Sequence, residues 1–311
     1  MRIGGVYFSI DVTNKSKTPI LVQEYDPSYQ LFFRQVNRGE NKNVNVRVRI
    51  ELEREDKLNP KELAKMTKVF DSEQSWSISR DRETKDVYWI VLHPPNHKKP
   101  LWAAQFNRDI SEVTVYCSPQ ISTKKDGKMV ISNPFRYPLD QLLLMYILAQ
   151  NHGAVIHAAG IEISGRGFIF PGRSGAGKST LSRLFTARDD QKNLEVFSDE
   201  RMVIRKINGI FTAFGTPWSG EAQIARNKSI TLYGIFFLHH GTDGGNRIKK
   251  IKPQEALEKL LPVTSIPWYD REVMPNVLHF CEDLISNIPC FDLHFTPGIE
   301  VVKCLEEFKK S

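Results

Sequence analysis

The chain has 311 residues, of which 41% are hydrophobic and 25% charged, a balance typical of a globular protein and unlike that of a disordered or fibrous one. The net charge is +7, but lysine and arginine are scattered without interleaved aromatics, so we expect no nucleic-acid partner. The four cysteines form no CxxC pair, which argues against a zinc knuckle or a dense disulfide framework. No stretch resembles a signal peptide or a membrane span, so we expect a cytoplasmic protein without a membrane partner.

The first part of the chain, residues 1–132, is predicted to be a β-rich N-terminal region. Apolar and polar residues alternate in several stretches, as they do in half-buried strands. These stretches are 44–52, 87–92 and, more loosely, 113–116. The charged turn at 123–128 is the best candidate for a seam, although a hairpin within one sheet would have the same composition. We therefore expect a second, catalytic domain over 133–311.

Two helices are predicted in or near this region. The first is short and lies around 60–66, where Pro60 opens the first turn. The second covers 137–148 and is apolar on nearly every face, which predicts a buried helix rather than a surface one. We expect the second helix to pack under the C-terminal half.

The most specific motif follows a predicted hairpin. Residues 154–163 and 168–170 have the composition of two strands, and the second runs directly into a segment that matches GxxxxGK[ST] and opens a helix. In this motif the glycines let backbone N–H groups curl around phosphate oxygens, while the lysine adds charge and the serine a hydroxyl for Mg²⁺. We therefore expect ATP or GTP to bind here. The expected cofactor-binding residues are Gly172, Arg173, Ser174, Gly175, Ala176, Gly177, Lys178, Ser179 and Thr180.

A metal on bound phosphates also needs a carboxylate at the end of a neighbouring strand. The segment 194–200 provides it, as a predicted strand that runs into Asp199 and Glu200. We expect Asp199 to hold Mg²⁺ together with Ser179, or to take a proton from an attacking hydroxyl, with Glu200 in the other of these roles. The alternative is a strand-ending turn with two solvated acids.

Two further candidates come from the residues around the motif. His157 lies near the head of the strand before the hairpin and could sit near the γ-phosphate, although a lone histidine is more often structural. The loop 214–221 contains glycines, a proline and Trp218, which we expect to be exposed on a substrate-facing surface, with a core corner as the alternative. Arg226 and Lys228 could neutralise phosphate charge or be solvated, and a buried strand is predicted over 230–238.

The run from His157 through the glycine loop to Arg201 resembles the catalytic core of HPr kinase/phosphorylases, bacterial serine kinases whose fold is related to that of ATP-dependent phosphoenolpyruvate carboxykinase. The resemblance implies a mixed α/β P-loop kinase core, with His157 and Lys178 in the catalytic centre. It also implies that Asp199 exchanges a proton with a seryl hydroxyl. The pattern is most similar to HPr-kinase-related proteins associated with peptide-modification clusters, some of which phosphorylate a serine on a precursor peptide.

The sequence therefore predicts a kinase that uses ATP and Mg²⁺ to phosphorylate a serine or similar hydroxyl of a protein or peptide. A small-molecule kinase is an alternative, as is a nucleotide-dependent binding module that transfers no phosphoryl group. Asp199 favours a kinase, because binding alone needs no base. A homo-oligomer is left open.

Overall fold

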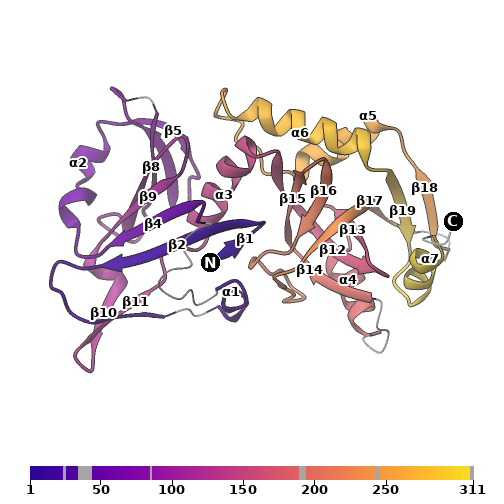
Figure 1. Ribbon diagram of the computed structural model, residues 1–311, viewed down its shortest axis with the longest axis horizontal. Coiled ribbons are helices and arrows are strands. Elements are labelled where there is room, and N and C mark those ends of the chain that lie inside the picture. Colours follow the sequence, from indigo (N-terminus) through magenta and orange to yellow (C-terminus); the bar gives the residue numbers. More distant parts are fainter. Residues whose placement is uncertain (24–25, 34–43, 85, 189–193, 242–244, 309–311) are drawn as a thin grey trace. The chain divides into compact units, whose positions relative to one another are not determined.

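The computed structural model describes residues 1–23, 26–33, 44–84, 86–188, 194–241 and 245–308 of a mixed α/β protein (Figure 1). The chain forms two compact units, and short N-terminal segments belong to the second. The first unit comprises Met1–Arg2, Val6–Pro27 and Phe33–Ile147; the second comprises Ile3–Gly5, Ser28–Phe32 and Leu148–Ser311. Within the described ranges no helix is both long and apolar enough to pass through a bilayer.

The first unit is built on a mixed eight-stranded sheet in the order β1-β2-β4-β9-β8-β7-β6-β5, with a separate three-stranded sheet β10-β11-β3. Three of its strands, β4, β7 and β9, confirm the predictions made from alternation. The strands are β1 (Arg2–Ile3), β2 (Val6–Thr13), β3 (Ile20–Gln23), β4 (Val46–Glu51), β5 (Thr67–Asp71), β6 (Trp76–Arg80), β7 (Val87–Leu92), β8 (Trp102–Asn107), β9 (Glu112–Cys117), β10 (Ser122–Lys125) and β11 (Lys128–Ser132). The charged turn considered as a seam joins β10 to β11 as a hairpin.

The short helix α2 (Pro60–Leu63) forms where Pro60 predicted it. Its first turn is capped because the side chain of Asn59 accepts a hydrogen bond of 3.0 Å from the backbone N–H of Lys61. The remaining short elements are α1 (Pro27–Gln30) and the 3-10 turns η2 (Glu55–Leu58) and η3 (Pro119–Ile121).

The helix α3 (Leu139–Gln150) is buried along most of its length, as its all-round apolar sequence predicted. The expectation that it packs under the C-terminal half is wrong for most of the helix. The ring of Tyr146 lies 5.5 Å from that of Tyr88 and 6.0 Å from that of Phe106, both on the sheet of the first unit. The chain passes from one unit to the other after Ile147.

The second unit holds an eight-stranded sheet in the order β13-β12-β15-β16-β17-β19-β18, with β14 also paired to β12. The parallel pairing of β13 with β17 closes part of this path into a ring. The strands are β12 (Gly153–Ile163), β13 (Arg166–Pro171), β14 (Leu194–Ser198), β15 (Arg201–Ile207), β16 (Ile210–Phe214), β17 (Ser229–His240), β18 (Arg247–Lys250) and β19 (Cys290–Phe295). Strand β17 confirms the buried strand predicted over 230–238.

Helices cover both faces of this sheet (Figure 1). On one face α4 (Lys178–Thr186) and α7 (Glu300–Phe308) contribute Leu181, Phe185, Val301 and Leu305 to a core that includes Phe236. On the other face lie α5 (Pro253–Leu260), the turn η4 (Leu261–Val263) and α6 (Met274–Asn287). The central strands β12 and β13 are buried along most of their length, so they form nearly continuous apolar runs.

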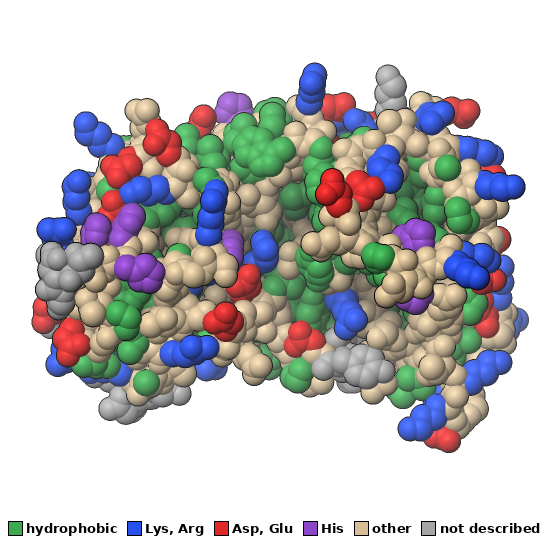
Figure 2. All heavy atoms as spheres, turned by 180° about the vertical axis from the view of Figure 1, so that it is seen from behind, with side chains coloured by type: hydrophobic (Ala, Val, Ile, Leu, Met, Phe, Trp, Pro, Cys, Tyr) green, Lys and Arg blue, Asp and Glu red, His purple; other side chains and the backbone are tan. Residues whose placement is uncertain are grey.

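Charged side chains contribute little to holding this fold. Lysine and arginine are interspersed with acidic residues over the face drawn in Figure 2. Ion pairs such as Lys15 with Asp56 and Lys65 with Glu62 are more than half exposed. Exposed pairs of this kind are worth about 0–1 kcal/mol each, so apolar burial dominates the stability.

Candidate active site

The glycine loop follows a tight β-hairpin, as predicted. Strands β12 and β13 are antiparallel, and their last pair is Ile163 with Arg166. The two residues between them, Ser164 and Gly165, have φ angles of 49° and 80°, the positive values that a two-residue hairpin turn requires. Strand β13 ends at Pro171, and α4 begins at Lys178. The hairpin therefore sends the chain directly from a buried strand into the loop and then into the helix.

The loop between β13 and α4 is shaped by its glycines. Gly175 and Gly177 have φ angles of 82° and 98°, which disfavour side chains with a Cβ. At Gly177 an added Cβ would also lie 2.9 Å from the ring of Phe295. The N–H of Gly172 donates to the backbone oxygen of His157 at 3.1 Å, which ties the start of the loop to β12. The exposed middle of the loop is thereby held against the first turn of α4, whose amides lack intrahelical acceptors.

The side chain of Lys178 is folded into this loop. It is 5% exposed, and its Nζ donates to the backbone oxygens of Gly172 at 2.8 Å and Arg173 at 3.1 Å. Burial lowers the pKa of Lys178, while the charges of Glu200 and Asp199 act in the opposite direction. The ammonium and the amides at the start of α4 are brought together, an arrangement that suits an anion.

The acidic pair lies beside the loop because of how β12 is paired. The first half of β12 pairs with β15, with His157 opposite Arg201; the second half pairs with β13 and β14, with Gly160 opposite Ser198. The two residues between β14 and β15 are the acids. The N–H of Ala158 donates to the backbone oxygen of Glu200 at 3.0 Å. One change of strand partner thus brings the loop, the histidine and both acids together.

Asp199 is fully buried and its carboxylate is occupied by backbone donors. Oδ1 accepts from the N–H groups of Gly220 at 2.9 Å and Ile224 at 3.3 Å, and Oδ2 accepts from that of Ala222 at 2.7 Å. A carboxylate offers about four acceptor positions, so at most about one is left. Asp199 therefore fixes the loop 216–224 to the end of β14. This role was not predictable from the residues alone, because the donors lie more than twenty residues downstream and are backbone groups.

Glu200 is the more accessible of the two acids. Its Oε1 lies 3.2 Å from Nε2 of His157, and its side chain is 34% exposed. The pKa of Glu200 is lowered, chiefly by the neighbouring His157 and further by the charges of Lys178 and Arg201, against the effect of burial. The carboxylate is therefore ionised at neutral pH, next to the buried ammonium of the loop. Gly220 borders both acids, since a Cβ there would lie 3.0 Å from Oε2 of Glu200.

The loop that follows β16 is a core corner, and the expectation of an exposed Trp218 is wrong. Trp218 is 6% exposed. The Oγ1 of Thr216 donates to the backbone oxygen of Arg201 at 2.5 Å, and the Oγ of Ser28 donates to that of Pro217 at 2.6 Å. These two hydrogen bonds fasten the loop to β15 and to α1, and the indole is buried, which a count of glycines and prolines does not reveal.

The two basic residues after this loop pair with acids. Arg226 Nε lies 3.4 Å from Oε1 of Glu195 on β14. The ammonium of Lys228 contacts the carboxylates of Glu195 and Glu162. Neither residue shows a contact with the glycine loop in the described part of the chain.

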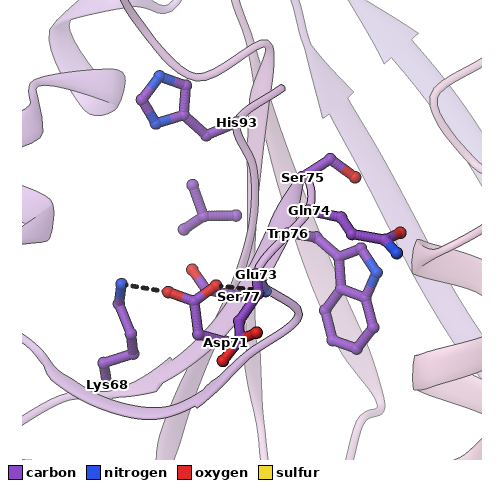
Figure 3. Close-up of a pocket in the computed structure, with 9 residues that line it drawn as sticks. Lys68, Asp71, Glu73, Gln74, Ser75, Trp76, Ser77 and His93 are labelled. Carbon is purple, nitrogen blue, oxygen red and sulfur yellow. Dashed lines mark hydrogen bonds and ion pairs between the residues drawn. The ribbon is translucent and has the colours of Figure 1, made fainter. Parts of the chain in front are cut away.

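A separate cavity of about 300 Å³ lies in the first unit, near the ends of β5 and β6 (Figure 3). Its wall includes the ion pair between Lys68 and Asp71, at 2.7 Å, and the side chains of Trp76 and His93. It shares no residue with the candidate active site, and nothing in the sequence pointed to it.

No known protein family matches the sequence. Nor does any curated protein. Among solved structures, the chain is similar to the Hpr(Ser) kinase/phosphatase from Coxiella burnetii, with 11% identity and a TM-score of 0.31 over 50% of this chain and 88% of that one. This similarity is weak, and it assigns no family to the chain.

Proposed function

We propose that this chain is an ATP-dependent kinase that transfers a γ-phosphoryl group to a serine or similar hydroxyl of a protein or peptide. The observation that carries the proposal is a glycine loop whose lysine ammonium is buried against the loop's own carbonyls, next to an ionised glutamate. A buried cation, free amides at a helix start and an accessible carboxylate are the groups that phosphoryl transfer needs.

The loop supplies the binding of the nucleotide. The ammonium of Lys178 and the backbone N–H groups of residues 174, 175 and 177–180 are the donors for the β- and γ-phosphoryl oxygens, since the N–H of Ala176 already donates to the oxygen of Arg173. To reach them, Lys178 exchanges its bonds to the oxygens of Gly172 and Arg173 for bonds to phosphate. Mg²⁺ fits the same place, because the hydroxyl of Ser179 and the acidic pair are oxygen donors of the kind it prefers, and when bound it neutralises phosphate charge.

We assign different roles to Asp199 and Glu200. Three backbone donors hold Asp199, so we assign it to positioning the loop 216–224, with its remaining acceptor position available to the metal. Glu200, accessible and ionised, accepts the hydrogen bond of the acceptor hydroxyl, and His157 orients its carboxylate. The hydroxyl oxygen forms a bond to the γ-phosphorus, the bond to the β–γ bridging oxygen breaks, ADP keeps that electron pair, and the hydroxyl proton passes to Glu200. A weak base suffices, because the transition state of phosphoryl transfer is loose.

Incubation with γ-labelled ATP and serine-containing proteins or peptides tests this function. We expect Lys178→Ala to reduce label transfer by at least about 100-fold, because a charge at the transferring group is lost. Lys303→Ala, an exposed lysine on α7, serves as the matched control. We expect Glu200→Gln to stop transfer while ATP binding persists. ATP binding without transfer to any acceptor, with Glu200→Gln unchanged from wild type in phosphate release, would instead support a binding module.

A further inference from the structure

A second group of polar side chains lies at the end of two parallel strands, directly before Phe295, the residue whose ring borders Gly177 of the glycine loop. His239 on β17 pairs in register with His294 on β19, and Asp292 lies two residues before His294. Alternation along a strand places all three on one face of the sheet, the face from which Lys259 of α5 reaches Asp292. Nε2 of His239 lies 2.9 Å from Oδ1 of Asp292, and the two imidazole rings stack at 4.7 Å.

These three side chains have the chemistry of a metal site. One ligand atom from each can be chosen so that all lie within 4.8 Å of one another. In the described part of the chain the ring of His294 has no hydrogen bond or ion pair, so its nitrogens are available. Two imidazoles and one carboxylate, with a position left for water, suit a divalent transition ion such as Zn²⁺. Ligand atoms around such an ion lie roughly 3.4 Å apart, so small side-chain adjustments complete the site.

A cation already occupies the carboxylate. Lys259 Nζ lies 2.6 and 2.8 Å from the two oxygens of Asp292, and 2.9 Å from Oε1 of Glu255. Asp292 is 7% exposed, so it needs a positive partner at all times. Glu255 provides a second carboxylate partner for the ammonium of Lys259. The exposed Arg247 and Lys249, opposite His294 and Asp292 on β18, add positive charge that weakens the binding of a dication.

We propose that His239, Asp292 and His294 bind one divalent transition-metal ion of the Zn²⁺ type, which replaces Lys259 on one oxygen of Asp292. The ion joins the ends of β17 and β19 through side chains, and Lys259 keeps its existing hydrogen bond to Glu255. The site shares no residue with the glycine loop, and the proposal does not rest on the proposed kinase activity.

Titration of the chelator-treated full chain with Co²⁺, followed by its visible absorption and without nucleotide, tests the site. We expect saturation at one Co²⁺ per chain, displacement by Zn²⁺ and no displacement by millimolar Mg²⁺, which prefers oxygen ligands. His294→Ala removes a ligand and weakens binding by more than about 100-fold, since even indirect partners of metal ligands cost 10–100-fold. Lys259→Met removes the competitor and tightens binding several-fold.

His240→Ala is the matched control, since this neighbouring histidine is exposed and outside the cluster, and it leaves the titration unchanged. His239→Ala provides a second ligand variant, and circular dichroism confirms that each variant is folded. Wild-type protein without saturable Co²⁺ absorption, or folded ligand variants that bind like wild type, would overturn the site. Weaker binding by Lys259→Met would overturn the exchange of cations.

Discussion

Asp199→Ala separates a structural role of this carboxylate from a chemical one. In the structure its two oxygens accept three backbone hydrogen bonds, from Gly220, Ala222 and Ile224. Hydrogen bonds to a charged group contribute about 1.5–3 kcal/mol each, but three that share one carboxylate are not additive. Because the site is fully buried, we expect the free energy of unfolding of the second unit to fall by about 3–4 kcal/mol. Hydrogen exchange should show faster exchange at these three amides.

The control for this substitution is Asp283→Ala. Asp283 forms an ion pair with Lys206 at 2.7 Å and is 38% exposed, so its loss should cost about 0–1 kcal/mol and leave the loop 216–224 protected. If Asp199→Ala cost less than about 1 kcal/mol and the three amides kept their protection, the carboxylate would not hold the loop. The division of labour between the two acids would then be wrong.

Three further substitutions or reactions probe other parts of the second unit. Gly177→Ala places a Cβ against Phe295 in a left-handed conformation, so we expect a lower melting temperature, from about 1–2 kcal/mol of backbone strain plus the clash, and loss of ATP binding by calorimetry. The pKa of Glu200 is lower in the folded protein than in the unfolded chain. Its ionised carboxylate therefore stabilises the fold at pH values above the unfolded-state pKa, and this contribution is lost as the pH falls through the folded-state pKa. Stability measured against pH should therefore differ between wild type and Glu200→Gln near neutrality and converge in acid. In native protein at pH 8, iodoacetamide should modify Cys304 first, since the other three thiols are buried.

Each of these three predictions has a control within the same protein. Gly245→Ala meets no atom within 4 Å and should be neutral. Glu258→Gln, on an exposed position of α5, is the matched control for Glu200→Gln. Burial raises the pKa of Cys281 to about 11 and of Cys290 to about 12, so their labelling should require unfolding. Early labelling of either thiol, a neutral Gly177→Ala or a Glu200→Gln profile parallel to wild type would contradict the packing described.

Local patterns predicted the elements around the candidate site well. The hairpin before the glycine loop could be predicted because Ser164-Gly165 is a short turn between two apolar runs. The helix after the loop could be predicted because the GxxxxGK[ST] motif is followed by a helix. The buried helix α3 was readable from its composition alone. These features depend on neighbours within a few residues, which is the range over which turn chemistry and periodicity act.

Contacts between distant segments were not predictable in the same way. Trp218 is buried because its loop is tied to Asp199, and the donors involved are amides, which every sequence contains. The contact of His157 with Glu200 arises where β12 exchanges one partner strand for another. The cluster of His239 and His294 requires the register of two parallel strands more than fifty residues apart. The pairing register of two distant strands cannot be predicted from a single sequence.

The most direct measurement for the whole account is a calorimetric titration of the chain with Mg·ATP, alongside Lys178→Ala. We predict one binding event per chain, with heat that is lost when the buried ammonium is removed. Wild-type protein that gives no heat, or a Lys178→Ala variant that binds as tightly as wild type, would contradict the assignment of residues 172–180 to a nucleotide's phosphates.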